Sequence, residues 1–180
     1  MGLDLLLSIG ISVGAWAWAL VWLAGDFTRL PFPWVPAWAP IVYWAAYFVF
    51  GGGAPKFGTV WKVLPCHLLG AVAATGVILA WSSFGPAGNF GLGLWIFVMV
   101  VVFGILAHIS IFSSIPASIL GACVTIGVFL LSVGADKTVT PWLNLANMVV
   151  IIIVGLALAW LSEVTVGWLV KKPEGQVEKA

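Results

Sequence analysis

The sequence predicts an all-α, polytopic membrane protein with about six transmembrane helices. Apolar residues make up 63% of the chain and charged residues only 7%, whereas soluble proteins average roughly a half and a quarter. The apolar runs are continuous and do not alternate with polar residues, which favours helices over the strands of a membrane barrel. One segment also recurs along the chain, which predicts a parallel duplication of a two-helix hairpin.

The chain has enough apolar runs for six spans, since a helix crosses the hydrocarbon core in about 20 residues. Loops rich in proline, glycine or charge separate these runs. The third span is expected to hold Pro65 in its first turn, after a turn bracketed by Lys56 and Lys62, and to end near Trp81. The other spans are expected at about residues 3–24, 38–50, 90–107, 116–133 and 142–170.

These spans form one transmembrane domain over residues 1–172, followed by a solvated cytoplasmic tail over residues 173–180. The second span is short, and three glycines, Gly51 to Gly53, follow it. A glycine-interrupted span is typical of a broken helix beside a solute site. A plain loop explains the same glycines equally well, so both interpretations stay open.

Small residues are expected to mediate close helix packing. In the first span they form a strip of four, Ser8, Gly10, Ser12 and Gly14.

The duplicated copies cover about residues 38–81 and 89–132 and are displaced by 51 residues. In each copy we expect a proline at the head of an apolar helix and small residues along one face, as a structural scaffold. Because two spans separate the copies, both must have the same orientation in the membrane. The shared positions are Pro65 with Pro116, Gly70 with Gly121, and Gly76 with Gly127.

The distribution of basic residues predicts that both termini are cytoplasmic. With six spans, the termini and the loops after the second and fourth spans lie on one side. That side carries five lysines, whereas the other has only Arg29 and Lys137, and lysine and arginine accumulate on the cytoplasmic side. The five lysines are Lys56, Lys62, Lys171, Lys172 and Lys179.

Several function classes are excluded. A net charge of +1 and the lack of a basic stripe argue against a nucleic-acid partner. No nucleophile stands beside a base, and neither a metal-ligand spacing nor a phosphate-binding glycine loop occurs. We therefore expect no enzyme, no cofactor and no metal. The expected partners are the lipid bilayer, a small solute if the protein transports one, and further copies of the chain, because six short helices enclose little volume alone.

Glu163 is the only carboxylate well inside a predicted span. Charged groups within a membrane are costly and mark functional sites, so Glu163 is a candidate proton carrier. The alternative is a position near the cytoplasmic interface, where it pairs with a lysine or extends toward the headgroups.

His67 and His108 are expected near the cytoplasmic ends of their spans. The repeat aligns His67 with Ser118 and His108 with Phe57, so the two histidines do not form a symmetric pair. Because imidazole titrates near neutral pH, each is either a pH-sensitive group or a satisfied interfacial histidine.

The remaining candidate pore or solute contacts are indole, hydroxyl and amide side chains within the spans. Such groups line a path for a small polar solute, or they pack and hydrogen-bond between helices, which is the commoner role. These residues are Trp16, Trp18, Trp44, Thr75, Thr125, Asn144 and Asn147.

Short motifs along most of the chain resemble a known bacterial family. They are Trp16-Ala17-Trp18, Trp44 with Gly51-Gly52-Gly53, Pro116-Ala117 with Gly121, and Ser162-Glu163 with Gly167-Trp168. On these motifs the chain resembles the small inner-membrane proteins grouped as domain of unknown function 1097. The resemblance implies a small multi-span protein of the bacterial inner membrane, and it assigns no functional residue.

Three functions remain open. The leading hypothesis is a channel or facilitator for a small neutral or weakly charged solute of the size of urea, ammonia or a short amide, because so few charges lie in the spans. The second is a non-transporting assembly or interaction subunit whose tryptophans and small-residue faces contact partner helices. The third is a proton-coupled carrier that uses Glu163.

Overall fold

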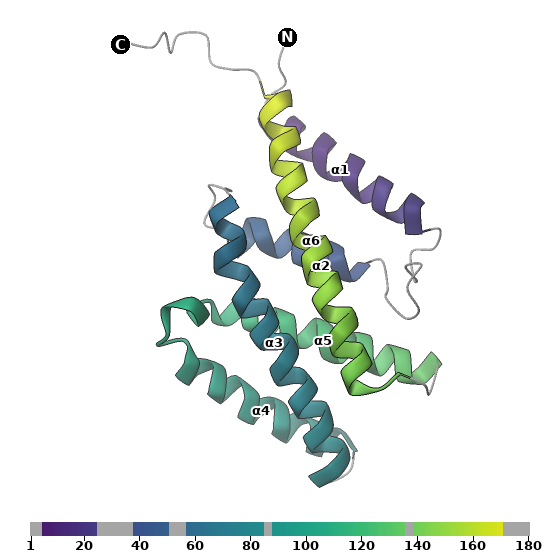
Figure 1. Ribbon diagram of the computed structural model, residues 1–180, viewed down its shortest axis with the longest axis vertical. Coiled ribbons are helices and arrows are strands. Elements are labelled where there is room, and N and C mark those ends of the chain that lie inside the picture. Colours follow the sequence, from purple (N-terminus) through teal and green to yellow (C-terminus); the bar gives the residue numbers. More distant parts are fainter. Residues whose placement is uncertain (1–4, 25–37, 51–56, 85–87, 136–138, 171–180) are drawn as a thin grey trace.

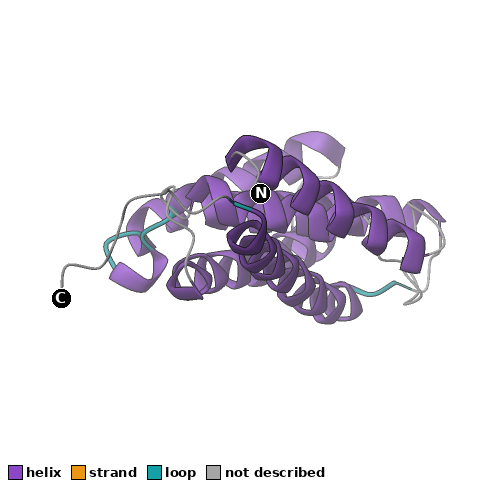
Figure 2. Ribbon diagram, turned by 90° about the horizontal axis from the view of Figure 1, so that it is seen from above, coloured by secondary structure: helices purple, strands orange, loops and turns teal. Residues whose placement is uncertain are grey.

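The computed structural model describes residues 5–24, 38–50, 57–84, 88–135 and 139–170. All regular elements in these ranges are helices (Figure 2). The six α-helices and one short 3-10 helix are α1 (Leu5–Ala24), α2 (Trp38–Phe50), α3 (Phe57–Phe84), α4 (Gly88–Leu106), η1 (Ser110–Phe112), α5 (Ile115–Ala135) and α6 (Pro141–Leu169). The all-α prediction is therefore confirmed.

Apolar helices of this length indicate a membrane protein. Within the described ranges, three helical segments are long and apolar enough to cross a bilayer: Thr59–Phe84, Gly88–Leu106 and Pro141–Leu169. Three shorter apolar segments accompany them: Leu7–Leu20, Trp38–Phe50 and Ile115–Leu131.

The start of α3 differs from the prediction. The helix begins at Phe57, so the stretch from there to Lys62, where the sequence predicts a turn, is helical, and Pro65 lies inside the helix and not in its first turn. Pro65 cannot donate a hydrogen bond to the preceding turn, yet the helix continues through it because Thr59, Val63 and Cys66 are buried against neighbouring elements. Tertiary packing here outweighs the helix-ending tendency of proline.

Pro116 does occupy the first turn of its helix, as predicted. The segment before it, which the repeat aligns with residues 57–63, forms a turn and η1 instead of a helix. The two repeat prolines therefore occupy different positions, one inside α3 and one at the start of α5.

Consecutive helices differ in direction. In Figure 1, α3 runs downward and α6 upward along the long axis, whereas α4 runs toward the left and α5 toward the right. The ends of α2 and α4 lie near the starts of α3 and α5 at the left of Figure 1. We call this end of the bundle, where α3 and α5 begin, the η1 end.

Helix α3 lies at the centre and packs most extensively on α5, while α6 packs on α1, α2 and α3. One apolar core joins α2, α3, α5 and α6 around Tyr47 and Ile152. A second core lies between α3, α4 and α5 around Ile78 and Phe103. Only Gly91, Met99 and Phe103 of α4 are buried, so most of its apolar surface faces outward.

Helices α3 and α5 approach most closely at Gly70 and Gly121. A Cβ atom on Gly70 would collide with the backbone of Ser118 and Ala122, and one on Gly121 would lie 2.5 Å from the carbonyl oxygen of His67. The contact is reciprocal, because the 51-residue offset that relates the two glycines also relates His67 to Ser118.

Other small residues do not mediate close packing as expected. A Cβ atom on Gly76 or Gly127 would meet nothing within 4 Å. In α1, Ser8 and Ser12 are buried, whereas Gly10 and Gly14 are exposed. Only half of the predicted strip is therefore buried. Residues one helical turn apart share a face of a helix, so the two serines lie on one face of α1 and the two glycines on another.

Candidate functional site

Polar side chains meet in the interior where α2, α3, α5 and α6 come together. We define the His67 cluster as Tyr43, His67, Gly121, Thr125 and Asn144. All five are buried. Three of them, His67, Thr125 and Asn144, are candidates from the sequence, and the structure brings them together.

His67 lies at the centre of this cluster and is fully buried. Its Nδ1 atom lies 2.8 Å from the carbonyl oxygen of Ala117 on α5. A carbonyl oxygen only accepts hydrogen bonds, so Nδ1 donates and carries a proton. In the neutral imidazole the other nitrogen, Nε2, is then an acceptor, and it is buried without a hydrogen-bond partner among the described residues.

Tyr43 connects α2 to this histidine. Its ring meets the imidazole edge-on, with the ring centroids 4.8 Å apart and the planes at 70°. Its hydroxyl donates to the Gly121 carbonyl oxygen over 3.4 Å. Helix α2 can lie this close to α6 because Gly155 of α6 has no side chain. A Cβ atom on Gly155 would lie 2.5 Å from the Pro40 carbonyl oxygen.

Thr125 and Asn144 extend the cluster to α6. The Thr125 hydroxyl donates to the carbonyl oxygen of Gly121 over 2.7 Å. The Asn144 side-chain amide donates to the carbonyl oxygen of Thr125 over 3.1 Å. Both groups thus hydrogen-bond to backbone carbonyls, which is the interhelical role that polar side chains commonly have in membrane proteins.

Glu163 forms a second polar contact, separate from the His67 cluster. The Tyr47 hydroxyl donates to its Oε2 atom over 2.7 Å. The Tyr47 ring is fully buried, whereas Glu163 is half-buried. In the described ranges Glu163 is the sole carboxylate. Its hydrogen-bond partner is the phenol of Tyr47, whereas a lysine is one of the partners expected at an interfacial position.

The other candidates lie apart from these contacts. Thr75 is buried and donates to the Ala71 carbonyl oxygen of its own helix over 2.9 Å. His108 is exposed after the end of α4, with Nδ1 3.1 Å from the Ile105 carbonyl oxygen. Asn147 is half-buried one turn beyond Asn144.

The three tryptophan candidates occupy three different environments. Trp16 is half-buried, and its indole N–H donates to the Thr165 hydroxyl over 3.1 Å, which joins α1 to α6. Trp18 is 67% exposed. Trp44 is buried in the core, and its indole nitrogen has no partner among the described residues.

Sequence reasoning missed Tyr43 and Tyr47. These are the only two tyrosines of the chain, and they stand one helical turn apart in the second span. That spacing places both on one face of a helix. The recurrence of a rare polar aromatic residue on one face was the available signal.

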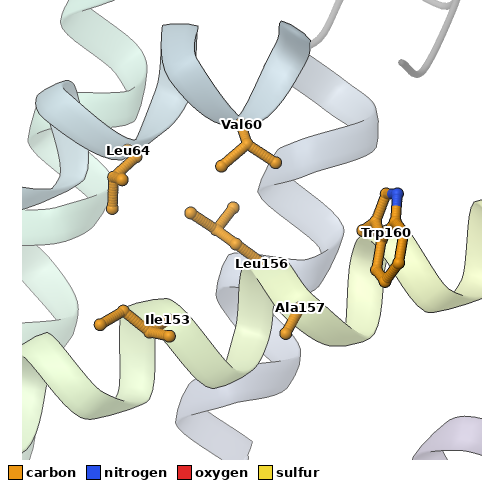
Figure 3. A pocket seen from close by; sticks show the side chains of 6 residues that line it. All are labelled: Val60, Leu64, Ile153, Leu156, Ala157 and Trp160. Atoms are coloured by element: carbon orange, nitrogen blue, oxygen red, sulfur yellow. The ribbon is translucent and has the colours of Figure 1, made fainter. Parts of the chain in front are cut away.

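An apolar cavity of about 210 Å³ lies between α3 and α6. Figure 3 shows Val60 and Leu64 on α3 facing Ile153, Leu156, Ala157 and Trp160 on α6. Because its lining is almost wholly apolar, this cavity provides few hydrogen-bond partners for a polar solute.

The chain belongs to the family described as "Protein of unknown function (DUF1097)", whose sequence profile matches residues 7–167. The match extends from α1 to α6 and confirms the resemblance inferred from the short motifs. No curated protein and no solved structure matches the chain.

Proposed function

We propose that this member of the DUF1097 family is a six-span protein of the bacterial inner membrane that facilitates passage of a small neutral or weakly charged solute. The solute is of the size of urea, ammonia or a short amide. The opposed directions of α4 and α5 (Figure 1) and the apolar composition support six spans. The lysine excess supports a cytoplasmic location for the η1 end and for both termini.

The reciprocal contact of Gly70 and Gly121 supports a parallel duplication. Copies related by an axis along the membrane normal meet through equivalent residues. In this arrangement α3 and α5 form the scaffold at the centre of the bundle, and the polar cluster lies where they cross.

The buried Nε2 atom of His67 carries the proposal. An unpartnered polar atom in the interior costs about 1–3 kcal/mol, and a passing solute removes that cost when it donates a hydrogen bond. With Nδ1 committed to Ala117, Nε2 accepts from an N–H or O–H group. Urea, ammonia and short amides all carry such donors.

The scarcity of charge favours a neutral solute over an ion. Lys62 and Glu163 are the only residues of the types Lys, Arg, Asp and Glu in the described ranges. Glu163 accepts a hydrogen bond from Tyr47, and Lys62 is exposed near the η1 end. An ion pathway normally carries rings or chains of charged groups.

The test measures solute flux into proteoliposomes by stopped-flow light scattering for urea, formamide and acetamide, and by an internal pH dye for ammonia. We expect flux above that of protein-free vesicles for at least one solute. His67→Phe keeps a ring against Tyr43 but removes Nε2, and we expect it to lower that flux about tenfold, the effect of one lost hydrogen bond of about 1.4 kcal/mol.

His108→Phe is the matched control, because His108 is exposed and bonds only to its own chain segment. It should leave the flux unchanged. Flux equal to that of empty vesicles for every solute contradicts the proposal, and an equal loss in both histidine variants removes His67 from the pathway.

The exposed apolar face of α4 favours a second candidate, a non-transporting subunit that packs on a partner. Phe90, Phe97 and Ile105 are 75%, 66% and 64% exposed. Purification in a mild detergent separates the two functions. Stoichiometric co-purification with one partner protein, together with absence of flux, supports the subunit; a symmetric homo-oligomer with flux supports the facilitator.

A further inference from the structure

A second cavity, of about 440 Å³, opens at the η1 end and differs in character from the apolar one. It lies between the end of α2, the first turns of α3 and the segment that joins α4 to α5. Its volume is within the range of about 300–1,000 Å³ that is usual for small-ligand sites. The lining residues are Phe50, Trp61, Lys62, Val63, Ser110, Ile111, Ser113, Ser114 and Pro116.

The polar part of this lining consists of one cation and three hydroxyls. Lys62 is the only Lys or Arg in the described ranges, and no carboxylate is among the lining residues. The side chains of Lys62, Ser110 and Ser113 are exposed, and Ser114 is half-buried. A lysine with several hydroxyl donors and no competing carboxylate suits a phosphate group, which carries negative charge and strong acceptor oxygens.

The apolar part of the lining suits the rest of a molecule that carries such a phosphate, such as a phospholipid. Phe50, Val63 and Ile111 contribute apolar surface, and Trp61 is 61% exposed at the same cavity. Tryptophan is enriched at the level of lipid headgroups. Basic pockets between helices on the cytoplasmic side are also where phospholipid headgroups bind.

We infer that this cavity binds a phosphate-bearing anion, either the headgroup of an anionic phospholipid or a free phosphate. Lys62 supplies the charge, and the serines of the η1 segment supply hydrogen-bond donors. This inference does not rest on solute facilitation, because the cavity and the His67 cluster share no residue.

The experiment measures the melting temperature of the purified full chain in a neutral detergent as ligand is added. Three arms use inorganic phosphate, short-chain phosphatidylglycerol and short-chain phosphatidylcholine. A ligand that binds the folded state stabilises it by RT ln(1 + [L]/Kd), so the melting temperature rises with the logarithm of ligand concentration once that concentration exceeds Kd. We expect phosphatidylglycerol to raise it more than phosphatidylcholine does.

The phosphate arm distinguishes the two sources. A rise with both inorganic phosphate and phosphatidylglycerol identifies the phosphate group itself as the ligand. A rise with phosphatidylglycerol alone identifies the lipid headgroup. A rise with inorganic phosphate alone identifies a free phosphate.

Lys62→Gln tests the assignment. Because Lys62 is exposed, this variant should fold, and its melting temperature without ligand checks that directly. Loss of one charge-assisted hydrogen bond should weaken binding about tenfold. Ser113→Ala, at a second exposed position, should weaken it by a smaller factor. Lys172→Gln removes the same charge from the C-terminal segment and should leave binding unchanged.

Three outcomes would overturn the inference. One is no rise in melting temperature with either phosphate or phosphatidylglycerol. Another is an equal rise with phosphatidylcholine and phosphatidylglycerol, which indicates a general lipid effect. The third is equal weakening by Lys62→Gln and Lys172→Gln, which indicates attraction by net charge.

Discussion

At the residue scale, the contact with Tyr47 changes the role expected for Glu163, a charged residue in an apolar helix. The carboxylate is half-buried and accepts a hydrogen bond of 2.7 Å from the buried Tyr47. This contact joins α2 to α6 and makes a structural role sufficient to explain the residue.

Glu163→Gln is expected to preserve this arrangement. The amide oxygen of glutamine still accepts from the Tyr47 hydroxyl, so the melting temperature should change little. Solute flux in proteoliposomes should keep its dependence on pH. A flux whose pH dependence disappears in this variant would instead identify Glu163 as a proton carrier.

Tyr47→Phe removes the donor and leaves the ring in place. We expect the free energy of unfolding to fall by about 1 kcal/mol, the upper part of the range measured for hydrogen bonds between membrane helices. Thermal unfolding in detergent measures this change. An unchanged melting temperature would show that the bond to Glu163 adds nothing to stability.

At the scale of elements, the crossing of α3 and α5 depends on two glycines. Gly70 and Gly121 each face the backbone of the opposite helix, and backbone atoms cannot move aside as a flexible side chain does. Close approach at small residues brings van der Waals contact that drives helix association in lipid. The polar contacts of His67 and Tyr43 then form beside this crossing.

Gly70→Ala and Gly121→Ala should each lower the free energy of unfolding by about 1–3 kcal/mol, the usual cost of an overpacked site. Gly127→Ala is the matched control on α5, since its Cβ position is open. Alanine favours a helix over glycine by up to about 1 kcal/mol, so this control should be neutral or stabilising. Equal melting temperatures for all three variants would contradict the close crossing.

At the scale of the whole molecule, the limits of four helices gather at one end of the bundle. The starts of α3 and α5 lie at the η1 end together with the ends of α2 and α4 (Figure 1). In the proposed six-span arrangement each end faces one compartment. The lysine distribution supports a cytoplasmic η1 end.

Single-cysteine labelling checks this orientation. In a background with Cys66→Ala and Cys123→Ala, Lys137→Cys should react with a membrane-impermeant maleimide in intact spheroplasts. Ser113→Cys should react only after the membrane is opened. Labelling of Ser113→Cys in intact spheroplasts would reverse the topology, and labelling of both sites there would contradict six spans.

Much of the helical framework could be predicted from composition and length. Long apolar runs bounded by proline, glycine and charge have few alternatives in lipid, because every backbone group must be hydrogen-bonded internally. The limits of α1, α2, α4 and α6 accordingly agree with prediction to within a few residues. The start of α3 does not, because the residues before Pro65 are helical through contacts that local sequence does not encode.

The candidate site could be predicted only in part. Polar residue type and depth in a span singled out His67, Thr125 and Asn144. The same criteria also selected Trp18 and His108, which are exposed, because type and depth do not reveal which face of a helix is buried. Tyr43 and Tyr47 were missed for the same reason.

The sequence by itself determined that this is an all-helical chain of apolar segments, that it belongs to its family, and which few polar groups those segments contain. Only the tertiary structure decided which of these polar groups and helix faces contact one another. Gly70 and Gly76 are chemically identical and lie on one helix, yet only Gly70 is at the crossing with α5. Contacts between helices depend on their rotation and crossing point, which arise from packing of the whole bundle.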